Sequence, residues 1–203
     1  MTRKVLLFIV SALFVLSAAS CMKDNDYKPL TKEEKAYCFQ QVGGSHTGKL
    51  LYSAVNPKNP MDNIDTLDVS WNIKNDSTLV IDYVPVKIFA EKISDKSLKE
   101  AVSAKNDVML ECRIGFQTTS PVQFLVNPKV ITYDNLTYDG VAHKVQIYFY
   151  ANYSGSYGAY NPAKNIHMVQ IVEAAVYVDE KLINQLSEDA PFLLYSGSLN
   201  DTK

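Results

Sequence analysis

Hydrophobic and polar side chains alternate along most of the chain with the period of two that is typical of β-strands. The clearest stretch is 67–73, where every second residue is apolar: Leu67, Val69, Trp71 and Ile73. Asn75 and Asp76 follow as a turn signal, and residues 79–84 then return as a second strand. This part of the chain therefore predicts a β-hairpin, which ends at Pro85 because proline cannot continue a hydrogen-bonded ladder.

The same alternation predicts further strands at 47–54, 108–116, 122–126, 130–133, 145–151, 166–178 and 192–195. Prolines and turn dipeptides separate them: a proline loop at 56–60, Asn127–Pro128 and Asp139–Gly140. Residues 152–164 are rich in Gly, Ser, Asn and Tyr and predict a long loop, while 179–190 fit either a helix or a turn.

Only short helices are expected. Thr31 and Glu34 match a capping box, which predicts a helix that ends at the Gly43–Gly44 pair. Ser97 and Glu100 match a second capping box, which predicts a short crossover helix. Together with about eight strands, this pattern predicts a mainly β domain, either an antiparallel sandwich or a partly open barrel.

The first twenty residues follow a different pattern. Arg3 and Lys4 precede an apolar run over 5–16, which as a helix is only about 18 Å long, too short for a bilayer core of about 30 Å. Small residues at 17–20 then precede Cys21. A basic start, a short apolar run and a small-residue end are typical of a secretory signal peptide.

The sequence Ser17-Ala18-Ala19-Ser20-Cys21 resembles the lipobox of bacterial lipoproteins. The resemblance implies a signal peptide over 1–20, cleavage before Cys21 and attachment of diacylglycerol and fatty acyl chains such as palmitate to that residue. Two or more acyl chains anchor a protein stably to a membrane. Residues 21–30 are then the lipidated cysteine with a flexible tether, and 31–203 are a single mainly-β domain.

The tether contains a short charged motif. Lys23 followed by Asp24 and Asp26 is similar to the export signal of Bacteroidota lipoproteins. This similarity implies an outer-membrane lipoprotein and favours the cell surface over the periplasmic face.

The charge of the mature chain argues against one class of partner. Removing the leader, which holds two basic residues and no acidic one, leaves 18 basic and 22 acidic residues, a net charge of −4. Nucleic-acid binding needs a concentrated basic face, so no nucleic-acid partner is expected.

Two cysteines remain after lipidation of Cys21. An oxidising compartment permits a disulfide between Cys38 and Cys112. Cys112 alternates with apolar residues on a predicted buried strand face, and two buried free thiols are the favoured interpretation.

The sequence carries no recognisable catalytic or metal-binding motif. His46, His143 and His167 lack metal-ligand spacing, and no nucleophile elbow or phosphate-binding glycine loop occurs. We therefore expect no catalytic residue, no metal and no cofactor.

A capped helix followed by Gly-Gly-Ser-His-Thr-Gly-Lys-Leu at 43–50 and then by β-hairpins resembles the small Bacteroidota lipoproteins classed as domains of unknown function. That resemblance implies an all-β extracytoplasmic domain and no particular activity.

The candidate ligand-binding residues are five tyrosines in one segment: Tyr148, Tyr150, Tyr153, Tyr157 and Tyr160. Ser, Gly and Asn lie between them, a composition like that of antibody paratopes. Aromatic rings also stack on sugar rings. The alternative is that these tyrosines simply pack on neighbouring strands.

The sequence thus predicts a non-catalytic, membrane-anchored binding or accessory module for a glycan or a partner protein. A lipocalin-like carrier of a small apolar ligand is the alternative, which a closed barrel with an apolar cavity would favour. A hydrolase of unfamiliar type is a third hypothesis, which needs a polar cleft.

Overall fold

The structure is a computed structural model of the 203-residue chain, and it describes residues 28–53, 64–185 and 191–197. The predicted signal peptide, the lipidation site Cys21 and the proline loop at 56–60 lie outside the described residues. Within the described part, no helix is long and apolar enough to cross a membrane.

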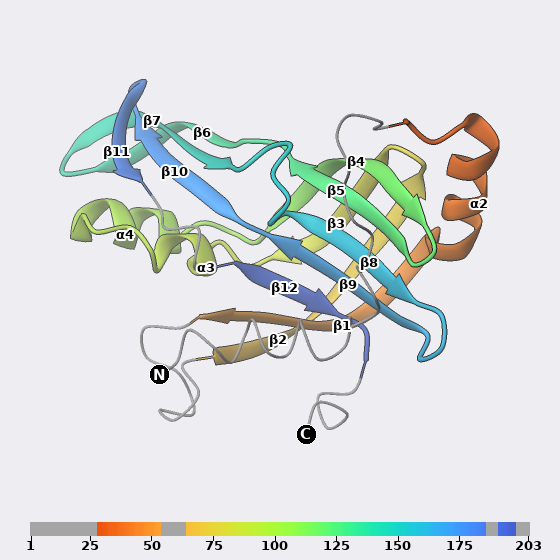
Figure 1. The fold of residues 1–203 in the computed structure, drawn as a ribbon. Coiled ribbons are helices and arrows are strands. Elements are labelled where there is room, and N and C mark those ends of the chain that lie inside the picture. Colours follow the sequence, from red (N-terminus) through yellow and green to blue (C-terminus); the bar gives the residue numbers. More distant parts are fainter. Residues whose placement is uncertain (1–27, 54–63, 186–190, 198–203) are drawn as a thin grey trace, which may run out of the picture.

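The fold is built on a closed antiparallel β-barrel. Its eight strands are β1 (Gly44–Ser53), β2 (Ile64–Asn75), β3 (Thr78–Val84), β4 (Val108–Thr119), β5 (Val122–Pro128), β8 (Tyr157–Asn161), β9 (Ile166–Ile171) and β12 (Phe192–Tyr195). The barrel closes where β1 pairs with both β2 and β12 (Figure 1). The mainly β prediction is confirmed, and of the two architectures expected the barrel is present, fully closed.

A second sheet extends from the barrel. Its strands are β6 (Ile131–Tyr138), β7 (Val141–Phe149), β10 (Glu173–Val178) and β11 (Lys181–Gln185), in the order β11-β10-β7-β6. The hairpin β6–β7 is inserted between β5 and β8, and β10–β11 between β9 and β12. The order of the barrel strands otherwise follows the chain.

Two of the predicted boundaries were wrong in the same region. Residues 166–178 are not one strand: β9 belongs to the barrel and β10 to the second sheet, and they separate at Val172. Residues 152–164 are not all loop, because β8 pairs there with β5 and β9. The alternation of apolar and polar residues did not predict β8, because this strand is short and contains Gly158, which packs against the Phe124 ring.

Other boundaries also differ from the expectation. Asn127 and Pro128 do not form the predicted turn but are the last two residues of β5, paired with Arg113 and Cys112 of β4. The strand predicted at 130–133 extends to Tyr138, and 181–185 forms β11 after a turn. Asp139–Gly140 is the predicted turn, with positive φ at both residues.

Helix α2 (Lys32–Val42) lies against β4 on the outside of the barrel. Its predicted capping box is confirmed, since the Glu34 amide donates to Thr31 Oγ1 at 3.2 Å and the Thr31 amide donates to Glu34 Oε2 at 2.7 Å. The helix ends at Gly43 as predicted, and Gly44 takes the positive φ of 103° that begins β1.

The crossover contains two short helices, α3 (Lys87–Ala90) and α4 (Lys96–Ser103). The predicted cap at Ser97 was wrong: Asp95 is the N-cap, and its carboxylate accepts from the Leu98 amide at 2.8 Å. The carboxylate side chain meets the same need for an acceptor at the helix start.

Most of the buried apolar side chains form one cluster that fills the barrel and continues under the second sheet. Phe89 of α3 joins the two parts, because its ring makes edge contacts with Phe149 of β7 and Phe192 of β12. Helix α3 therefore connects the barrel and the second sheet through the core.

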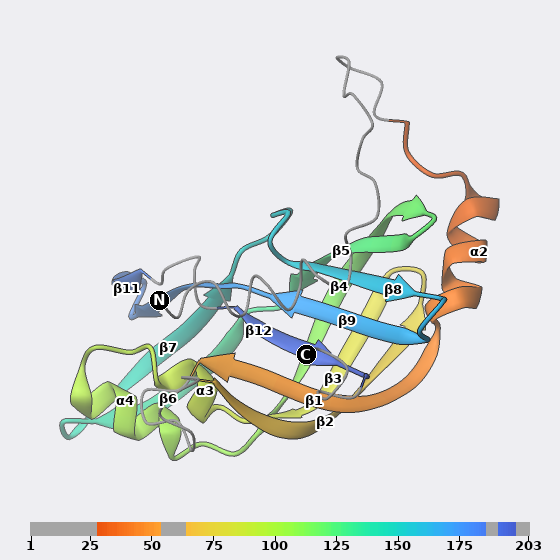
Figure 2. The same cartoon turned by 60° about the horizontal axis from the view of Figure 1, so that its bottom comes forward.

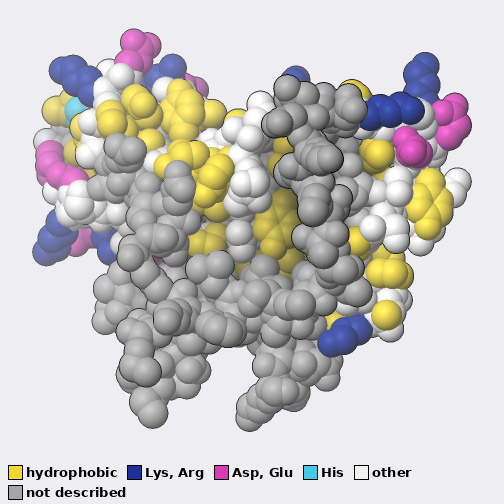
Figure 3. Space-filling model, in the orientation of Figure 1, with side chains coloured by type: hydrophobic (Ala, Val, Ile, Leu, Met, Phe, Trp, Pro, Cys, Tyr) yellow, Lys and Arg dark blue, Asp and Glu magenta, His cyan; other side chains and the backbone are white. Residues whose placement is uncertain are grey.

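A smaller apolar cluster lies on the outer face of the barrel. It consists of Leu51, Ala159, Ile166, Met168, Leu193 and Tyr195. Figure 3 shows that the exposed hydrophobic side chains gather elsewhere, over the strands of the second sheet. All four residues of β12 are buried because two face the barrel interior and two face this outer cluster.

Both remaining cysteines are buried, free thiols. Cys38 Sγ lies 3.6 Å from the Thr118 carbonyl oxygen, and Cys112 faces the barrel interior. Burial raises the pKa of the Cys112 thiol far above its ordinary range, so it stays protonated and unreactive.

Candidate functional site

The structure distributes the five predicted tyrosines over three places. Tyr148 lies on β7, and Tyr150 and Tyr153 lie in the loop that follows. Tyr157 and Tyr160 lie on β8 of the barrel, where Tyr157 packs against the outer apolar cluster and Tyr160 stacks on His167. The five therefore do not form one surface.

Three of them share the open face of the second sheet with a tyrosine that sequence reasoning missed. Because Phe149 faces the core, Tyr148 on the same strand faces the opposite side, and Tyr150 follows directly after the strand. Tyr148 contacts Tyr177 of β10, with ring centroids 5.0 Å apart, and Tyr150 contacts Tyr153 at 5.1 Å. We call Tyr148, Tyr150, Tyr153 and Tyr177 the tyrosine surface.

Tyr177 was missed because it lies 24 residues after Tyr153, in a segment predicted as core strand. The signal available was the strand alternation itself, in which Tyr177 stands between the buried residues Val176 and Val178. Only the pairing of β10 with β7 brings it next to Tyr148.

The tyrosine surface is half-buried and keeps polar groups available to a ligand. Within the described residues, the hydroxyls of Tyr148, Tyr150 and Tyr177 make no hydrogen bond, while their rings lie in the two aromatic pairs. Such rings offer an apolar face together with a hydroxyl that can donate or accept.

The loop that carries Tyr150 and Tyr153 is fixed by hydrogen bonds. The Asn152 amide donates to Asn127 Oδ1 at 2.6 Å, and Asn127 Nδ2 donates to Asn152 Oδ1 at 3.3 Å. Gln170 Nε2 donates to the Gly155 carbonyl at 2.8 Å. Because the loop is held in place before any ligand arrives, binding there costs less ordering entropy.

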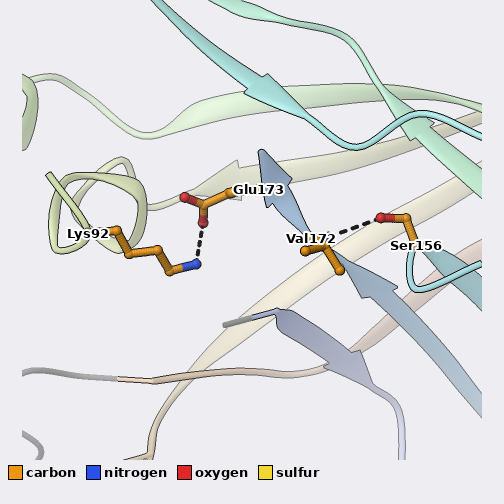
Figure 4. Close-up of polar contacts among 4 residues, drawn as sticks. All are labelled: Lys92, Ser156, Val172 and Glu173. Atoms are coloured by element: carbon orange, nitrogen blue, oxygen red, sulfur yellow. Dashed lines mark hydrogen bonds and ion pairs between the residues drawn. The ribbon is translucent and has the colours of Figure 1, made fainter. Parts of the chain in front are cut away.

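Buried polar contacts support this loop from beneath (Figure 4). The Val172 amide donates to Ser156 Oγ at 3.1 Å, and the Val172 carbonyl accepts from the Tyr150 amide at 3.1 Å. Ser156 is fully buried. The two peptide groups at Val172 therefore hold both ends of the loop to the point where the chain passes from β9 to β10.

Glu173, the next residue, forms a buried ion pair with Lys92, which follows α3 (Figure 4). Lys92 Nζ lies 2.8 Å from Glu173 Oε1, and the Glu173 side chain is only 1% exposed. Burial raises the pKa of the Glu173 carboxyl, and the Lys92 ammonium opposes part of that rise. Glu173 Oε2 has no hydrogen-bond partner among the described residues.

Four rings form a stack at the barrel end next to α2. His46 lies between Trp71 and His167, at centroid distances of 5.7 and 4.0 Å, and His167 stacks on Tyr160 at 4.5 Å. His46 Nε2 donates to the Val42 carbonyl at 2.9 Å. The positions of the two histidines in the sequence did not predict that their rings are in contact.

Protonation of His167 is unfavourable in this stack. Burial, with a smaller contribution from His46, lowers the pKa of His167 to about 4. The third histidine, His143, lies apart and contacts Asp179 Oδ2 at 2.7 Å. Among the described residues, no group of three or more acidic, histidine or cysteine side chains is placed to hold a metal ion.

The molecule is therefore an antiparallel β-barrel domain extended by a second sheet that carries an aromatic surface. The chain belongs to the DUF4840 family, a domain of unknown function, whose model matches residues 41–178. That range runs from the end of α2 to the end of β10 and includes the whole tyrosine surface. No curated protein and no solved structure matches the chain.

Breaking the buried ion pair should destabilise the fold strongly. Lys92→Met leaves the Glu173 carboxylate buried without its ammonium, and we expect a loss of about 3–5 kcal/mol in the free energy of unfolding. The double variant Lys92→Met/Glu173→Met should recover most of that loss. Urea unfolding measures both.

The exposed pair Lys96–Glu100, whose atoms are 3.9 Å apart, provides the matched control. Lys96→Met should cost less than about 1 kcal/mol, because exposed ion pairs contribute little. Equal losses for the two lysine variants would contradict a buried, structurally important pair.

The ring stack should make the protein sensitive to acid between pH 6.5 and 4. In that window the unfolded chain protonates His167 while the folded chain does not, so the free energy of unfolding falls as pH falls. Because His167 is only partly buried, we expect a contribution of about 1–2 kcal/mol.

His167→Gln removes this contribution, and urea midpoints at pH 7 and pH 4.5 measure it. The variant should lose less stability over that range than the parent protein. The same loss in both proteins would show that another group is responsible.

Proposed function

We propose that this protein is a non-catalytic, membrane-anchored module that binds a glycan through its tyrosine surface. The observation that carries the proposal is the pair of tyrosine contacts on the open face of the second sheet, with three hydroxyls that make no hydrogen bond within the described chain. Sugars present apolar C–H faces and hydroxyl edges, which match a tyrosine ring and its hydroxyl respectively.

Rigidity of the site favours binding. The reciprocal Asn127–Asn152 contact and the hydrogen bonds at Val172 fix the loop beneath the rings. A ligand therefore meets aromatic faces that are already in place, as in matured paratopes.

The arrangement of charged groups supports a binding role over a catalytic one. Glu173 lies next to the loop, since it pairs with Phe149 of β7, yet its side chain forms an ion pair with Lys92 and is only 1% exposed. A carboxylate that solvent does not reach is placed to stabilise the fold rather than to meet a substrate.

Anchoring at the N-terminus suits this geometry. Helix α2, which follows the tether, and the second sheet lie at opposite ends of the molecule (Figures 1 and 2). With a lipidated Cys21 in the outer membrane, the tether would join the molecule at the end opposite the second sheet. We propose the cell surface rather than the periplasmic face as the side on which it is displayed.

Replacing the tyrosine surface should weaken glycan binding without unfolding the protein. We expect Tyr148→Ala/Tyr153→Ala/Tyr177→Ala to weaken glycan binding by about tenfold or more, because stacking on the rings supplies the affinity. A glycan array followed by calorimetry with the best glycan measures the loss. Protein purified from its native membrane also allows the mass of any acyl chains on Cys21 to be measured.

Tyr37→Ala is the control, since Tyr37 is 49% exposed on α2 at the far end of the molecule. It should bind like the parent protein. An array without a single binding glycan, or undiminished binding by the triple variant, would contradict the proposal. If the triple variant instead loses binding to a defined partner protein, the tyrosine surface is a protein-recognition site rather than a glycan site.

The closed eight-stranded barrel favours one second candidate, a lipocalin-like carrier of a small apolar ligand. The described interior is occupied by large side chains, among them Trp71, Phe116 and Phe124. A carrier would need these side chains to move aside for its ligand.

Trp71 is the single tryptophan of the chain and lies inside the barrel, 1% exposed. Its fluorescence therefore reports on the interior. Under the glycan proposal, titration with a long-chain fatty acid should leave the emission unchanged. A saturable shift or quenching at a stoichiometry of one would favour the carrier instead.

A further inference from the structure

A hollow of about 550 Å³ lies on the outer face of β1, β2 and β3, on a different part of the molecule from the tyrosine surface. Ser196 and Gly197, which follow β12, complete its lining. Its volume is in the range of ordinary small-ligand sites, about 300–1,000 Å³. Neither the tyrosine surface nor the buried ion pair contributes a residue to it.

Tyr83 at this hollow has an unusual backbone. Its φ is +52°, in the left-handed region that large side chains rarely occupy, and its side chain is 77% exposed. It lies at an irregularity in the β3–β4 ladder, between Ile81 and Val84. The exposed ring makes no hydrogen bond or ring contact within the described chain, so packing does not explain why this strained residue is a tyrosine.

Polar side chains of both kinds line the hollow beside this ring. Lys49 of β1 donates to Asp68 Oδ1 of β2 at 2.6 Å. Ser70 of β2 donates to Asp82 Oδ2 of β3 at 3.3 Å. Each carboxylate thus keeps one oxygen that accepts no hydrogen bond within the described residues.

These groups select the chemistry of the ligand. A cation site is lined by acceptor oxygens alone. Here an ammonium and hydroxyls lie among the carboxylates. An acidic sugar would face Asp68 and Asp82 against a single ammonium that is already paired. A neutral ligand rich in hydroxyls satisfies donors and acceptors together and places a C–H face on the Tyr83 ring.

We propose that this hollow is a binding site for a neutral sugar residue, with Tyr83 as its stacking platform and Asp68 and Asp82 as acceptors for sugar hydroxyls. The site is separate from the tyrosine surface and does not depend on it. Where both sites engage one polysaccharide, the second contact becomes intramolecular and the overall affinity rises without any new contact.

The experiment is affinity electrophoresis of the full chain in native gels. The gels contain one of four neutral polysaccharides (α-mannan, β-glucan, xylan or starch) or the acidic polygalacturonate. Retardation by at least one neutral polysaccharide, and by polygalacturonate less strongly, is the expected result. The dissociation constant follows from the dependence of mobility on polysaccharide concentration.

Tyr83→Gly is the decisive variant, because glycine adopts positive φ freely. It should bind the retarding polysaccharide about tenfold more weakly or worse, while its melting temperature stays equal or rises. Asp82→Asn should weaken binding as well. The control Tyr37→Ala should migrate like the parent protein.

The variant Tyr148→Ala/Tyr177→Ala separates this site from the tyrosine surface. If this variant still binds the neutral polysaccharide and Tyr83→Gly does not, the result supports the sugar site in the hollow. Loss only in the tyrosine-surface variant leaves the proposed function standing and overturns this inference. No retardation by any neutral polysaccharide, unchanged retardation of Tyr83→Gly, or stronger retardation by polygalacturonate also overturns it.

Discussion

The structure depends on one break in a hydrogen-bond ladder, at Val172. Every buried peptide group needs a partner, so a strand can leave one sheet for another only where other groups replace its ladder partners. At Val172 the replacements are the hydroxyl of Ser156 and the amide of Tyr150. The barrel, the second sheet and the tyrosine loop therefore meet at a single residue, and the orientation of each determines that of the others.

This change of sheet places a charged side chain in the core one residue later. Glu173 lies in the core because its strand has just changed sheets, and Lys92 from the crossover supplies the ammonium that its carboxylate needs there. Helix α3 positions Lys92, and Phe89 of the same helix packs between the barrel and the second sheet. The Lys92–Glu173 ion pair and the Phe89 ring contacts thus both join the barrel to the second sheet. Lys92 and Phe89 belong to the same short crossover.

Local patterns gave the fold class and several boundaries. The hairpin around Asn75–Asp76, the Thr31 capping box and the Asp139–Gly140 turn all depend on neighbours within a few residues, and all were predicted. The division of 166–178 at Val172 was not, because both halves are apolar and the break depends on Ser156 from another segment. Strand β8 was missed for a related reason: its pairing with β5 and β9, not its composition, makes it a strand.

The candidate sites show the same limit. The sequence picked out a tyrosine-rich segment, and three of its five tyrosines do share a surface. Their neighbour Tyr177, however, comes from a strand brought there by pairing. The stack of His46 and His167 joins residues 121 positions apart, and the strained Tyr83 stands in a segment that reads as an ordinary strand. Each of these features follows from backbone register, which local patterns do not specify.

The closure of the barrel has a consequence for when the fold can form. Strand β12 spans only Phe192–Tyr195, yet it alone joins β1 to β9. The first and last edges of the meander are separated by more than a hundred residues of intervening chain, so closing it is a late and entropically costly step. Until residue 195 emerges, β1 has an unpaired edge. The barrel therefore cannot close before β12 is available, so a strand of four residues decides when the open sheet becomes a barrel.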